Sequence, residues 1–460
     1  MAISAALILA AGKGTRMKSA LVKVLHELAG RPMLGWPLAA AREAGAGQIV
    51  IVAGHQADQV QKRFGAVPGI RIALQEEQLG TGHAVSCSLD QLDGLSGAVL
   101  ILCGDTPLLT AATLQRLAAE HAASGAAVTV LTAKLERPFG YGRIVRDSEG
   151  RVRRIVEQKD ASPDEQAIDE VNSGIYCMEL EFLRAHIGRL GSENAQNEYY
   201  LTDLVGIAVA EHAGCSAVVA DDPDEIMGVN DRVQLAHAAR VLRQRINLQL
   251  MLAGVTLVDP DQTYIDASVQ VGSDTVIWPG CVLRGATSIG SGCTLENNVR
   301  VSDCVIADRV QLKAGSVLSE AQVAEDVSVG PMAHLRPGSV LQAQVKIGNF
   351  VETKKMVMGT GSKASHLTYL GDAEIGSDVN IGCGTITCNY DGRHKHKTVI
   401  GDGVFVGSDV QLVAPVTVGA NALIAAGTTV TQDVPPDSLA IARTPQVNKT
   451  GWCLKKRDNG

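Results

Sequence analysis

The sequence predicts two folds in one chain, an α/β domain followed by a parallel β-helix. Up to about residue 230, apolar runs of strand length alternate with amphipathic segments. Beyond residue 254, single aliphatic residues recur every six positions almost to the end of the chain. A chain of 460 residues is also too long for one ordinary hydrophobic core, which supports a division into domains.

The composition is that of a globular protein with a small-residue core. Hydrophobic residues make up 46% of the chain and charged residues 20%, whereas aromatic residues make up only 3%. The formal net charge of −8 gives no support for a protein that coats nucleic acid or an anionic membrane. Ten cysteines form no CxxC pair and no zinc-like cluster, so free thiols in a reducing cytoplasm are expected.

The elements of the first domain, residues 1–230, follow from the alternation. The runs Ala5–Ala11, Ile49–Ala53 and Ala98–Cys103 are expected to be buried strands, and Met33–Glu43 and Leu114–Ser124 helices between them. The first run is read as a strand rather than a signal segment, because no basic region precedes it and a glycine loop follows. In such sheets the ligand binds beyond the carboxyl ends of the strands.

A linker helix is expected over residues 231–254, because its apolar residues fall on one stripe and Gly254 is a natural stop. The β-helix is expected over residues 255–440 and a basic tail over 441–460. Aliphatic residues at a spacing of six fit short strands joined by tight turns, with eighteen residues in each three-sided coil. The repeat is continuous at Val271, Ile277, Leu283, Ile289, Leu295 and Val301, continues at Ala307 with a parallel run at Ile306, Leu312 and Leu318, and returns at Ile400, Val406, Leu412, Val418, Ile424 and Val430.

The first chemical motif is LILAAGKGTRM at residues 7–17, a strand that runs into a glycine-rich turn. Such a turn exposes backbone N–H groups to a phosphate, and Arg16 can clamp a polyphosphate. The turn lacks the spacing of a P-loop and the third glycine of the dinucleotide fingerprint, so by itself it could be purely structural.

The longer pattern resembles the nucleotide-sugar pyrophosphorylase family. Lys23-Val24-Leu25, Gln75 with Leu79-Gly80-Thr81-Gly82, Cys103-Gly104-Asp105, Gly140-Tyr141-Gly142, Ile155-Val156-Glu157, Asn172-Ser173-Gly174 and Gly228-Val229-Asn230 follow in the family's order. The resemblance implies a Rossmann-like nucleotidyltransferase domain that uses Mg²⁺ and joins UTP to a sugar 1-phosphate with release of pyrophosphate. Cys103 replaces the family's usual Tyr, and Val22 its usual Pro.

The same resemblance implies a role for individual residues. Arg16 and Lys23 would stabilise the phosphates, and Asp105 and Asn230 would hold Mg²⁺. The uridine and phosphate end would contact Leu9, Ala10, Ala11, Gly12, Lys23, Gln75, Gly80, Thr81, Cys103, Gly104 and Asp105, and the N-acetylglucosamine end Gly142, Glu157, Asn172 and Asn230.

The six-residue register slips near residues 353–358 and 370–375, and a longer segment interrupts it between Thr387 and Ile400. Functional residues are expected at such departures, because the regular coils are scaffold. The motifs there, Arg336-Pro337-Gly338, Val351-Glu352-Thr353-Lys354, Ser365-His366-Leu367-Thr368-Tyr369, Asn380-Ile381-Gly382-Cys383 and Cys388-Asn389-Tyr390, resemble the left-handed β-helix of the hexapeptide-repeat acyltransferases that acetylate glucosamine 1-phosphate.

In this resemblance His366 is the general base that an ammonium substrate requires, and Glu352 is expected to orient it. Arg336, Lys354, Tyr369 and Asn380 would bind glucosamine 1-phosphate, with Asn389 reaching the same phosphate or acetyl-CoA. Acetyl-CoA would contact Cys383, Tyr390, Ser408, Ala426 and Arg443. Cys383 stands where Ala is common; an acyl-carrying role for it has no activating base in its favour.

Together the motifs predict a bifunctional enzyme that makes UDP-N-acetylglucosamine, a precursor for the cell wall, from UTP, acetyl-CoA and sugar phosphates. A homotrimer assembled through the β-helix is expected from the same resemblance. Two alternatives remain at this point: a nucleotidyltransferase whose β-helix is only a scaffold, and a non-catalytic subunit that binds a nucleotide sugar. Loss of His366 would have favoured the first and loss of Asp105 the second, and both residues are present.

Overall fold

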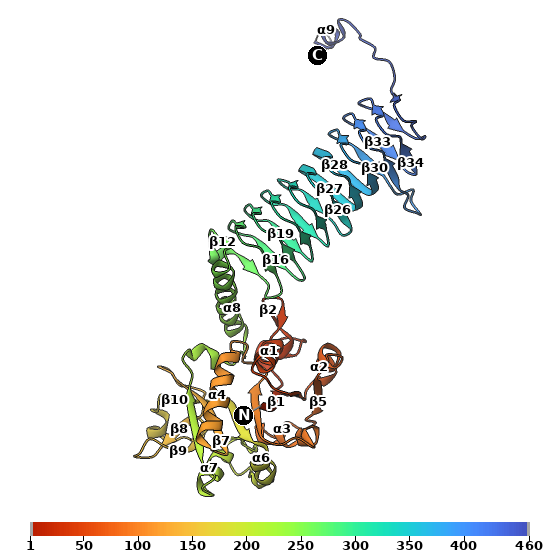
Figure 1. Cartoon of the computed structure of the whole chain (residues 1–460). Helices are drawn as coiled ribbons and strands as arrows, with labels where there is room; N and C mark the ends of the chain where they lie inside the picture. The colour runs from red at the N-terminus through yellow and green to blue at the C-terminus, as the bar shows by residue number, and fades with distance from the viewer. Residues whose placement is uncertain (1–2, 458–460) are drawn as a thin grey trace. The chain divides into compact units, whose positions relative to one another are not determined.

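The computed structural model describes residues 3–457 and divides into two compact units, one ending at Leu242 and one beginning at Arg243 (Figure 1). The boundary lies inside helix α8 (Arg232–Leu252), where the sequence predicts a linker helix. Ala238 and Leu242 in its first half pack in a cluster with Leu28, Met33 and Leu108 of unit 1. Ile246, Leu250 and Met251 in its second half pack against the core of unit 2. Each half of the helix therefore belongs to a different core.

Unit 1 is built on a sheet of nine strands in the order β11-β7-β10-β6-β1-β4-β5, with β8 and β9 at its side. The strands are β1 (Ile3–Ala10), β4 (Gln48–Ala53), β5 (Ile70–Leu74), β6 (Ala98–Cys103), β7 (Val128–Lys134), β8 (Arg143–Arg146), β9 (Val152–Val156), β10 (Glu170–Glu179) and β11 (Cys215–Val219); a separate hairpin pairs β2 (Glu27–Leu28) with β3 (Arg31–Pro32). The three strands predicted from apolar runs, β1, β4 and β6, are neighbours and run parallel.

Helices cover both faces of this sheet because its central strands are buried on both sides. They are α1 (Gly35–Glu43), α2 (Ala57–Phe64), α3 (Thr81–Ser86), α4 (Ala111–Ser124), α5 (Pro163–Gln166), α6 (Leu180–His186) and α7 (Asp203–Ala210), with 3₁₀ turns η1 (Thr15–Met17), η2 (Lys23–Leu25), η3 (Leu89–Leu92), η4 (Ile187–Arg189) and η5 (Pro223–Ile226). The predicted helices over Met33–Glu43 and Leu114–Ser124 correspond to α1 and α4. Strand β10 runs antiparallel to β6 and β7, so the sheet is mixed rather than wholly parallel.

Unit 2 is a parallel β-helix in which most strands pair with the third strand along the chain, which gives three faces to each coil (Figure 1). Its strands are β12 (Thr256–Leu257), β13 (Tyr264–Ile265), β14 (Gln270–Val271), β15 (Val276–Ile277), β16 (Val282–Arg284), β17 (Ser288–Ile289), β18 (Thr294–Leu295), β19 (Arg300–Ser302), β20 (Val305–Ile306), β21 (Gln311–Leu312), β22 (Val317–Ser319), β23 (Gln322–Val323), β24 (Ser328–Val329), β25 (His334–Leu335), β26 (Ser339–Leu341), β27 (Lys346–Met358), β28 (Lys363–Ile375), β29 (Asn380–Ile381), β30 (Ile386–Cys388), β31 (Thr398–Ile400), β32 (Phe405–Val406), β33 (Gln411–Val413), β34 (Val416–Val418), β35 (Leu423–Ile424), β36 (Thr429–Val430) and β37 (Leu439–Ala440), with one 3₁₀ turn, η6 (Pro260–Gln262).

The aliphatic repeat forms the core of this coil, as expected: Ile277 to Val301 and Ile400 to Val430 are buried in one continuous cluster, and Val271 packs against it. The register differs from the prediction at one place. Ile306 is buried and Ala307 is only half-buried, because Val305 and Ile306 pair with Ser288 and Ile289 in a coil that is one residue shorter. The step from Val301 to Ile306 is therefore five residues, and the spacing of six resumes from Ile306 to Leu312 and Leu318.

The last element of the described residues is a short helix, α9 (Trp452–Arg457), which follows an extended segment. The ammonium of Lys449 lies 5.0 Å from the ring centre of Trp452. Among the residues that the structure describes, no helix has the length and apolar character that a membrane span requires.

Candidate active sites

A cavity of about 280 Å³ opens beyond the carboxyl ends of β1 and β6 in unit 1, where a ligand of an α/β sheet is expected. Ten residues predicted to bind the nucleotide line it together: Leu9, Ala10, Ala11, Gly12, Lys23, Gln75, Gly80, Thr81, Cys103 and Asp105. Val24, Gln78, Ala84 and Glu198 complete the lining. Gly104 lies behind it, where its N–H donates to the carbonyl of Leu9 at 2.8 Å and ties β1 to the strand-end turn.

The glycine loop brings Lys23 to this cavity. A Cβ atom on Gly14 would lie 2.6 Å from Cβ of Lys23, and φ at Gly14 is +59°, so only glycine permits this approach. Arg16 follows in η1 but is exposed and is not part of the cavity lining. Its predicted phosphate contact therefore needs the side chain to reach the cavity from the loop.

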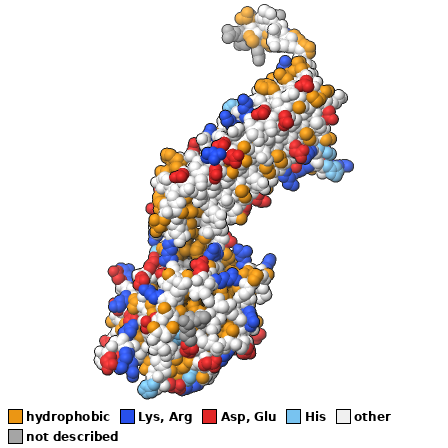
Figure 2. All heavy atoms as spheres, in the orientation of Figure 1, with side chains coloured by type: hydrophobic (Ala, Val, Ile, Leu, Met, Phe, Trp, Pro, Cys, Tyr) orange, Lys and Arg blue, Asp and Glu red, His pale blue; other side chains and the backbone are white. Residues whose placement is uncertain are grey.

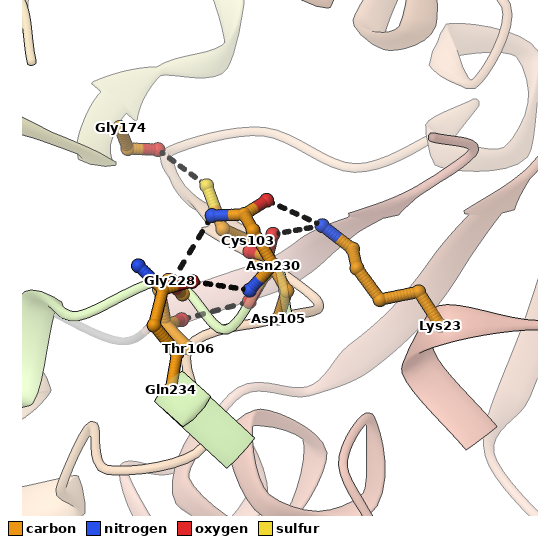
Figure 3. A network of polar contacts seen from close by, with 8 residues as sticks. All are labelled: Lys23, Cys103, Asp105, Thr106, Gly174, Gly228, Asn230 and Gln234. Atoms are coloured by element: carbon orange, nitrogen blue, oxygen red, sulfur yellow. Dashed lines mark hydrogen bonds and ion pairs between the residues drawn. The ribbon is translucent and has the colours of Figure 1, made fainter. Parts of the chain in front are cut away.

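Lys23, Asp105 and Asn230 converge from three segments far apart in the sequence (Figure 3). The ammonium of Lys23 lies 2.5 Å from a carboxylate oxygen of Asp105 and 3.1 Å from the amide oxygen of Asn230. Backbone contacts fix both acceptors, because Val229 N–H donates to the Asp105 carbonyl at 2.8 Å and Asn230 N–H donates to Gln234 at 2.7 Å. The side-chain oxygens of Asp105 and Asn230 thus both contact the ammonium of Lys23, which lines the nucleotide cavity.

The predicted sugar end lies around β8, β9 and β10. A Cβ atom on Gly142 would lie 3.5 Å both from Cβ of Asn172 and from a carboxylate oxygen of Glu157, so the absence of a side chain keeps the space between them open. Burial raises the pKa of Glu157, and Thr202 donates to this carboxyl at 3.4 Å. Glu157 also lines a second cavity, of about 560 Å³.

Asn172 and Cys103 are held by neighbouring groups. The amide oxygen of Asn172 accepts hydrogen bonds from Gly174 N–H at 3.1 Å and from the hydroxyl of Tyr176 at 3.0 Å, which leaves its NH₂ group for a ligand. The Cys103 thiol donates to the Gly174 carbonyl at 3.5 Å (Figure 3). Burial raises the pKa of this thiol to about 12, so it stays protonated.

In unit 2, His366 on β28 stacks on Asn349 of β27 in the preceding coil. Nδ1 of His366 lies 3.1 Å from Oδ1 of Asn349. With an oxygen at this position Nδ1 is the donor, so Nε2 keeps a lone pair. The prediction that Glu352 orients His366 is wrong in this structure, because Glu352 stacks on Tyr369 and forms an ion pair with Arg336 at 2.7 Å.

The corner that carries His366 has the left-handed backbone that recurs at other corners of the β-helix, as at Met332 one coil before Phe350 (φ +53°). Phe350 and Leu367 have φ angles of +57° and +34°, a region that bulky residues rarely adopt. Both side chains are exposed, at 60% and 61%.

Arg336 and Lys354, two cations predicted to bind the sugar phosphate, lie near one another, together with Lys395, which the sequence did not indicate. Lys395 contacts Lys354 and is the main reason why the pKa of Lys354 is lowered, and Arg336 acts in the same direction. Asn389 donates to the Tyr369 hydroxyl at 3.4 Å. A Cβ atom on Gly371 would lie 2.3 Å from that hydroxyl, so glycine makes room for Tyr369.

The predicted acetyl-CoA residues form a column across successive coils. Asp409 N–H donates to the carbonyl of Cys383 at 2.7 Å, and Gly427 N–H donates to the carbonyl of Ser408 at 2.9 Å, which places Cys383, Ser408 and Ala426 at one corner. The guanidinium of Arg443 donates to the Ala426 carbonyl at 2.7 Å. Asn380 lies on β29 next to this corner, and Tyr390 is exposed on the inserted loop.

Comparison with known proteins gives the same division of the chain. Residues 6–166 match the MobA-like NTP transferase domain, residues 261–363 the GMPPB C-terminal domain, and residues 397–432 the bacterial transferase hexapeptide family with six repeats. The chain is 98% identical over 460 residues to Bifunctional protein GlmU of Trichlorobacter lovleyi, with 100% of both chains covered. The chain belongs to the GlmU family. Relatives of the same name from Pelobacter propionicus and Geotalea uraniireducens are 67% and 61% identical over 453 residues, covering 98% of this chain and 98% and 99% of theirs.

As a GlmU family member the chain is a bifunctional transferase, with a nucleotidyltransferase unit and a hexapeptide acetyltransferase unit that together make UDP-N-acetylglucosamine. This excludes the two alternatives of a scaffold β-helix and a non-catalytic subunit.

The structure adds residues that sequence motifs alone did not indicate. Glu198 and Gln78 line the nucleotide cavity, and Thr202 contacts Glu157. Tyr199 N–H donates to the Leu79 carbonyl and Gly82 N–H to the Tyr199 carbonyl, both at 2.8 Å, so this segment is tied to the predicted nucleotide motif. These residues lie in the segment Asn197-Glu198-Tyr199-Tyr200-Leu201-Thr202. Its combination of polar and aromatic residues within the α/β domain is the sequence feature that could have indicated a binding role.

Proposed function

We propose that the two reactions are carried out by the residue sets described above: uridylyl transfer at Lys23, Asp105 and Asn230, and acetyl transfer at His366. The observation that carries the first assignment is the convergence of Asp105 and Asn230 on one cation, the ammonium of Lys23. Carboxylate and amide oxygens are ligands that suit Mg²⁺, so this pair fits the metal that the resemblance implies. When bound, Mg²⁺ would neutralise developing charge on the phosphates.

In the first unit, the protein's contribution is position and charge. Gly12 and the backbone of Leu9–Ala11 lie along the floor of the cavity where a triphosphate would bind. Lys23 would move its positive charge from Asp105 to the phosphates as the ligands take up the metal. Glu157 and the NH₂ group of Asn172 would hold the hydroxyl and acetamido groups of the sugar, so that its phosphate attacks the α-phosphate of UTP in line.

In the second unit, Nε2 of His366 would remove a proton from the ammonium of glucosamine 1-phosphate. The free amine then attacks the thioester carbonyl of acetyl-CoA, the C–S bond breaks, and CoA leaves as the thiol after taking up a proton. Arg336, Lys354 and Lys395 supply three positive charges for the sugar phosphate. The column of Cys383, Ser408 and Ala426 would bind acetyl-CoA through its backbone.

We infer that the working form is a trimer that assembles through the β-helix. The support is a set of exposed large apolar side chains on this unit. Figure 2 shows orange patches on the face of the β-helix that it draws. The exposed side chains are Val305, Met332, Phe350, Val357, Leu367, Ile386, Phe405, Val413, Leu423 and Leu439. Because Phe350 and Leu367 flank His366, a neighbouring copy would both cover them and complete the acetyl site. Ten free cysteines suit a cytoplasmic location.

The decisive experiment is a one-pot reaction of the purified protein with glucosamine 1-phosphate, acetyl-CoA, UTP and Mg²⁺, followed by mass spectrometry. Free CoA, pyrophosphate and UDP-N-acetylglucosamine are expected together. Omitting Mg²⁺ should stop pyrophosphate release and leave CoA release unchanged. Background hydrolysis alone would refute the proposal, and a monomer in light scattering would refute the assembly.

A further inference from the structure

One cation of unit 1 is buried without a counter-ion, and the mechanism above does not use it. It is Arg143, the first residue of β8, which is only 2% exposed. Its guanidinium donates to the carbonyl of Tyr141, to Oε1 of Gln158 at 2.9 Å and to the carbonyl of Gln166 at 3.4 Å. All three acceptors are neutral, and within residues 3–457 Arg143 forms no ion pair. Burial of a charge without a counter-ion costs free energy, so packing alone does not explain Arg143.

The residue before Arg143 carries an unused hydrogen-bond donor. Gly142 is buried and its carbonyl accepts from Asn172 N–H at 2.9 Å, but within the described part of the chain its own N–H donates to no acceptor. Buried backbone N–H groups are rarely left unpaired, so this donor is available to a ligand. A Cβ atom on Gly142 would lie 3.5 Å from a carboxylate oxygen of Glu157, so there is open space between this glycine and that carboxylate.

One hydrogen bond of Arg143 sets the direction of this donor. The carbonyl of Tyr141 and the N–H of Gly142 belong to the same peptide unit, and in a trans peptide they point in opposite directions. Because the guanidinium holds the carbonyl, the Gly142 N–H points away from Arg143. Among residues 3–457 no other donor reaches the Tyr141 carbonyl, so Arg143 alone fixes its orientation.

The neighbouring peptide units are held by other contacts, which leave this one free to turn. Tyr141 N–H donates to the Pro138 carbonyl at 3.3 Å, and the Gly142 carbonyl accepts from Asn172. A peptide unit between two held neighbours can still flip by rotation about its two flanking bonds, and a glycine on one side makes this rotation easy. A flip would exchange the positions of the carbonyl and the N–H. Arg143 therefore keeps a donor, rather than an acceptor, on the side away from the guanidinium.

We propose that Arg143 is a positioning residue for the sugar: it holds the Tyr141–Gly142 peptide so that the Gly142 N–H donates to a hydroxyl group of N-acetylglucosamine 1-phosphate. This rests on the proposed function of Glu157 and Asn172 as the sugar end of the site. A hydroxyl group both donates and accepts, so it can donate to the carboxylate of Glu157 and accept from Gly142 N–H at the same time. A flipped peptide would instead place a second acceptor beside the carboxylate, with one hydroxyl proton between them.

The test measures the KM of both substrates of pyrophosphate release in full-length protein with Mg²⁺. Arg143→Met keeps most of the length of the side chain and removes its donors, so the peptide can flip. We expect the KM for N-acetylglucosamine 1-phosphate to rise about tenfold, the loss of one hydrogen bond, while the KM for UTP stays within about twofold. Arg143→Lys cannot reach all three acceptors together and should give an intermediate rise. Arg146→Met is the matched control, because Arg146 lies on the same strand and pairs with Glu170 instead; it should change neither KM by more than about twofold.

A second measurement separates positioning from a general structural effect. The 3-deoxy, 4-deoxy and 6-deoxy forms of N-acetylglucosamine 1-phosphate each lack one hydroxyl group. For one of them, kcat/KM should fall about tenfold relative to the parent sugar in the wild type, but at most about threefold in Arg143→Met, which has already lost that hydrogen bond. For the other two, the fall should be the same in both proteins.

The KM for UTP reports whether unit 1 has folded, and if Arg143→Met does not fold, Arg143→Lys replaces it in both measurements. An unchanged KM for the sugar in a folded Arg143 variant would overturn the inference while the proposed function stands. An equal rise in both KM values, or an unchanged fall for all three deoxy sugars, would overturn it in the same way. Wild-type protein that releases no pyrophosphate would refute both.

Discussion

Oδ1 of Asn349 lies 3.1 Å from Nδ1 of His366, and the two residues occupy paired positions in adjacent coils of the β-helix. This contact assigns the Nδ1 proton and leaves Nε2 as the atom that can act as a base. Asn349, and not Glu352, is therefore the residue that contacts His366, because Glu352 forms an ion pair with Arg336.

The first prediction concerns this pair. Asn349→Ala should lower kcat for acetyl transfer by roughly tenfold, because the imidazole loses the partner that fixes its tautomer and orientation. The KM for glucosamine 1-phosphate should change little, since Asn349 is not part of the cation group. Steady-state CoA release measures both constants, and uridylylation by the same sample is the internal control. An unchanged kcat would show that Asn349 has no positioning role.

The second prediction concerns Lys395, which contacts Lys354 on the phosphate side of the acetyl site. Lys395→Ala should raise the KM for glucosamine 1-phosphate by about tenfold, the loss expected for one charge-assisted phosphate contact. The kcat should stay within about twofold, because the base is intact. Lys397→Ala is a matched control, since Lys397 instead pairs with Glu374. Equal effects of both changes would mean that only the overall charge of the loop matters.

The third prediction concerns the shared cation site. Asp105→Asn keeps the size of the side chain but removes its charge, and should reduce Mg²⁺-dependent pyrophosphate release by about 10² to 10³-fold. Acetyl transfer should remain at the wild-type rate, because it belongs to the other unit. Coupled phosphate and CoA assays on one preparation measure both activities. Pyrophosphate release within a factor of three of wild type would remove Asp105 from the mechanism.

The fourth prediction concerns thiol reactivity. Cys383 and Cys453 are exposed, whereas burial raises the pKa of Cys103 to about 12. At pH 8 almost no Cys103 is thiolate, so iodoacetamide should modify Cys383 and Cys453 before Cys103. Acetyl-CoA should protect Cys383 and leave Cys453 reactive. Peptide mass spectrometry over time measures the order; protection of both cysteines by acetyl-CoA would contradict the placement of Cys383 alone at the ligand.

Much of this architecture could be predicted because its signals are periodic or local. The strand that ends at Ala10 and the aliphatic residues from Ile277 to Val301 are determined by their own sequence and burial. The partner of His366 could not be predicted, because it depends on register between coils. Asn349 and His366 are 17 residues apart, whereas Val282 and Arg300 are 18 apart, and only the folded corner shows which spacing applies.

Two other features depend on contacts between distant segments. Strand β10 contains only the short apolar run Ile175–Met178, and its antiparallel pairing with β6 and β7 is visible only in the folded sheet. Lys395 lies in a loop of mixed charges, where sequence alone does not distinguish a ligand from a solvated cation. Its position beside Lys354 becomes visible only in the folded loop, which the Tyr390–Lys395 bridge closes on itself.

The last prediction concerns a buried histidine in unit 1. His121 has no exposed side-chain surface; its Nδ1 lies 2.9 Å from the Thr129 hydroxyl and its Nε2 lies 3.3 Å from a Glu179 carboxylate oxygen. Burial lowers the pKa of His121 below 6.5, and this outweighs the opposing effect of Glu179.

Because the folded-state pKa of His121 lies below the unfolded value of 6.5, the unfolded chain binds the proton more readily. The stabilisation is therefore fully present above about pH 6.5 and is lost as the pH falls below it. The temperature of half-inactivation of uridylyl transfer should drop by about 2–4 °C between pH 7.5 and 5.5. His121→Gln should reduce this drop without abolishing it, because burial also lowers the pKa of His26. Acetyl transfer, measured on the same heated samples, is the control for unit 2, and an undiminished drop in His121→Gln would contradict the assignment.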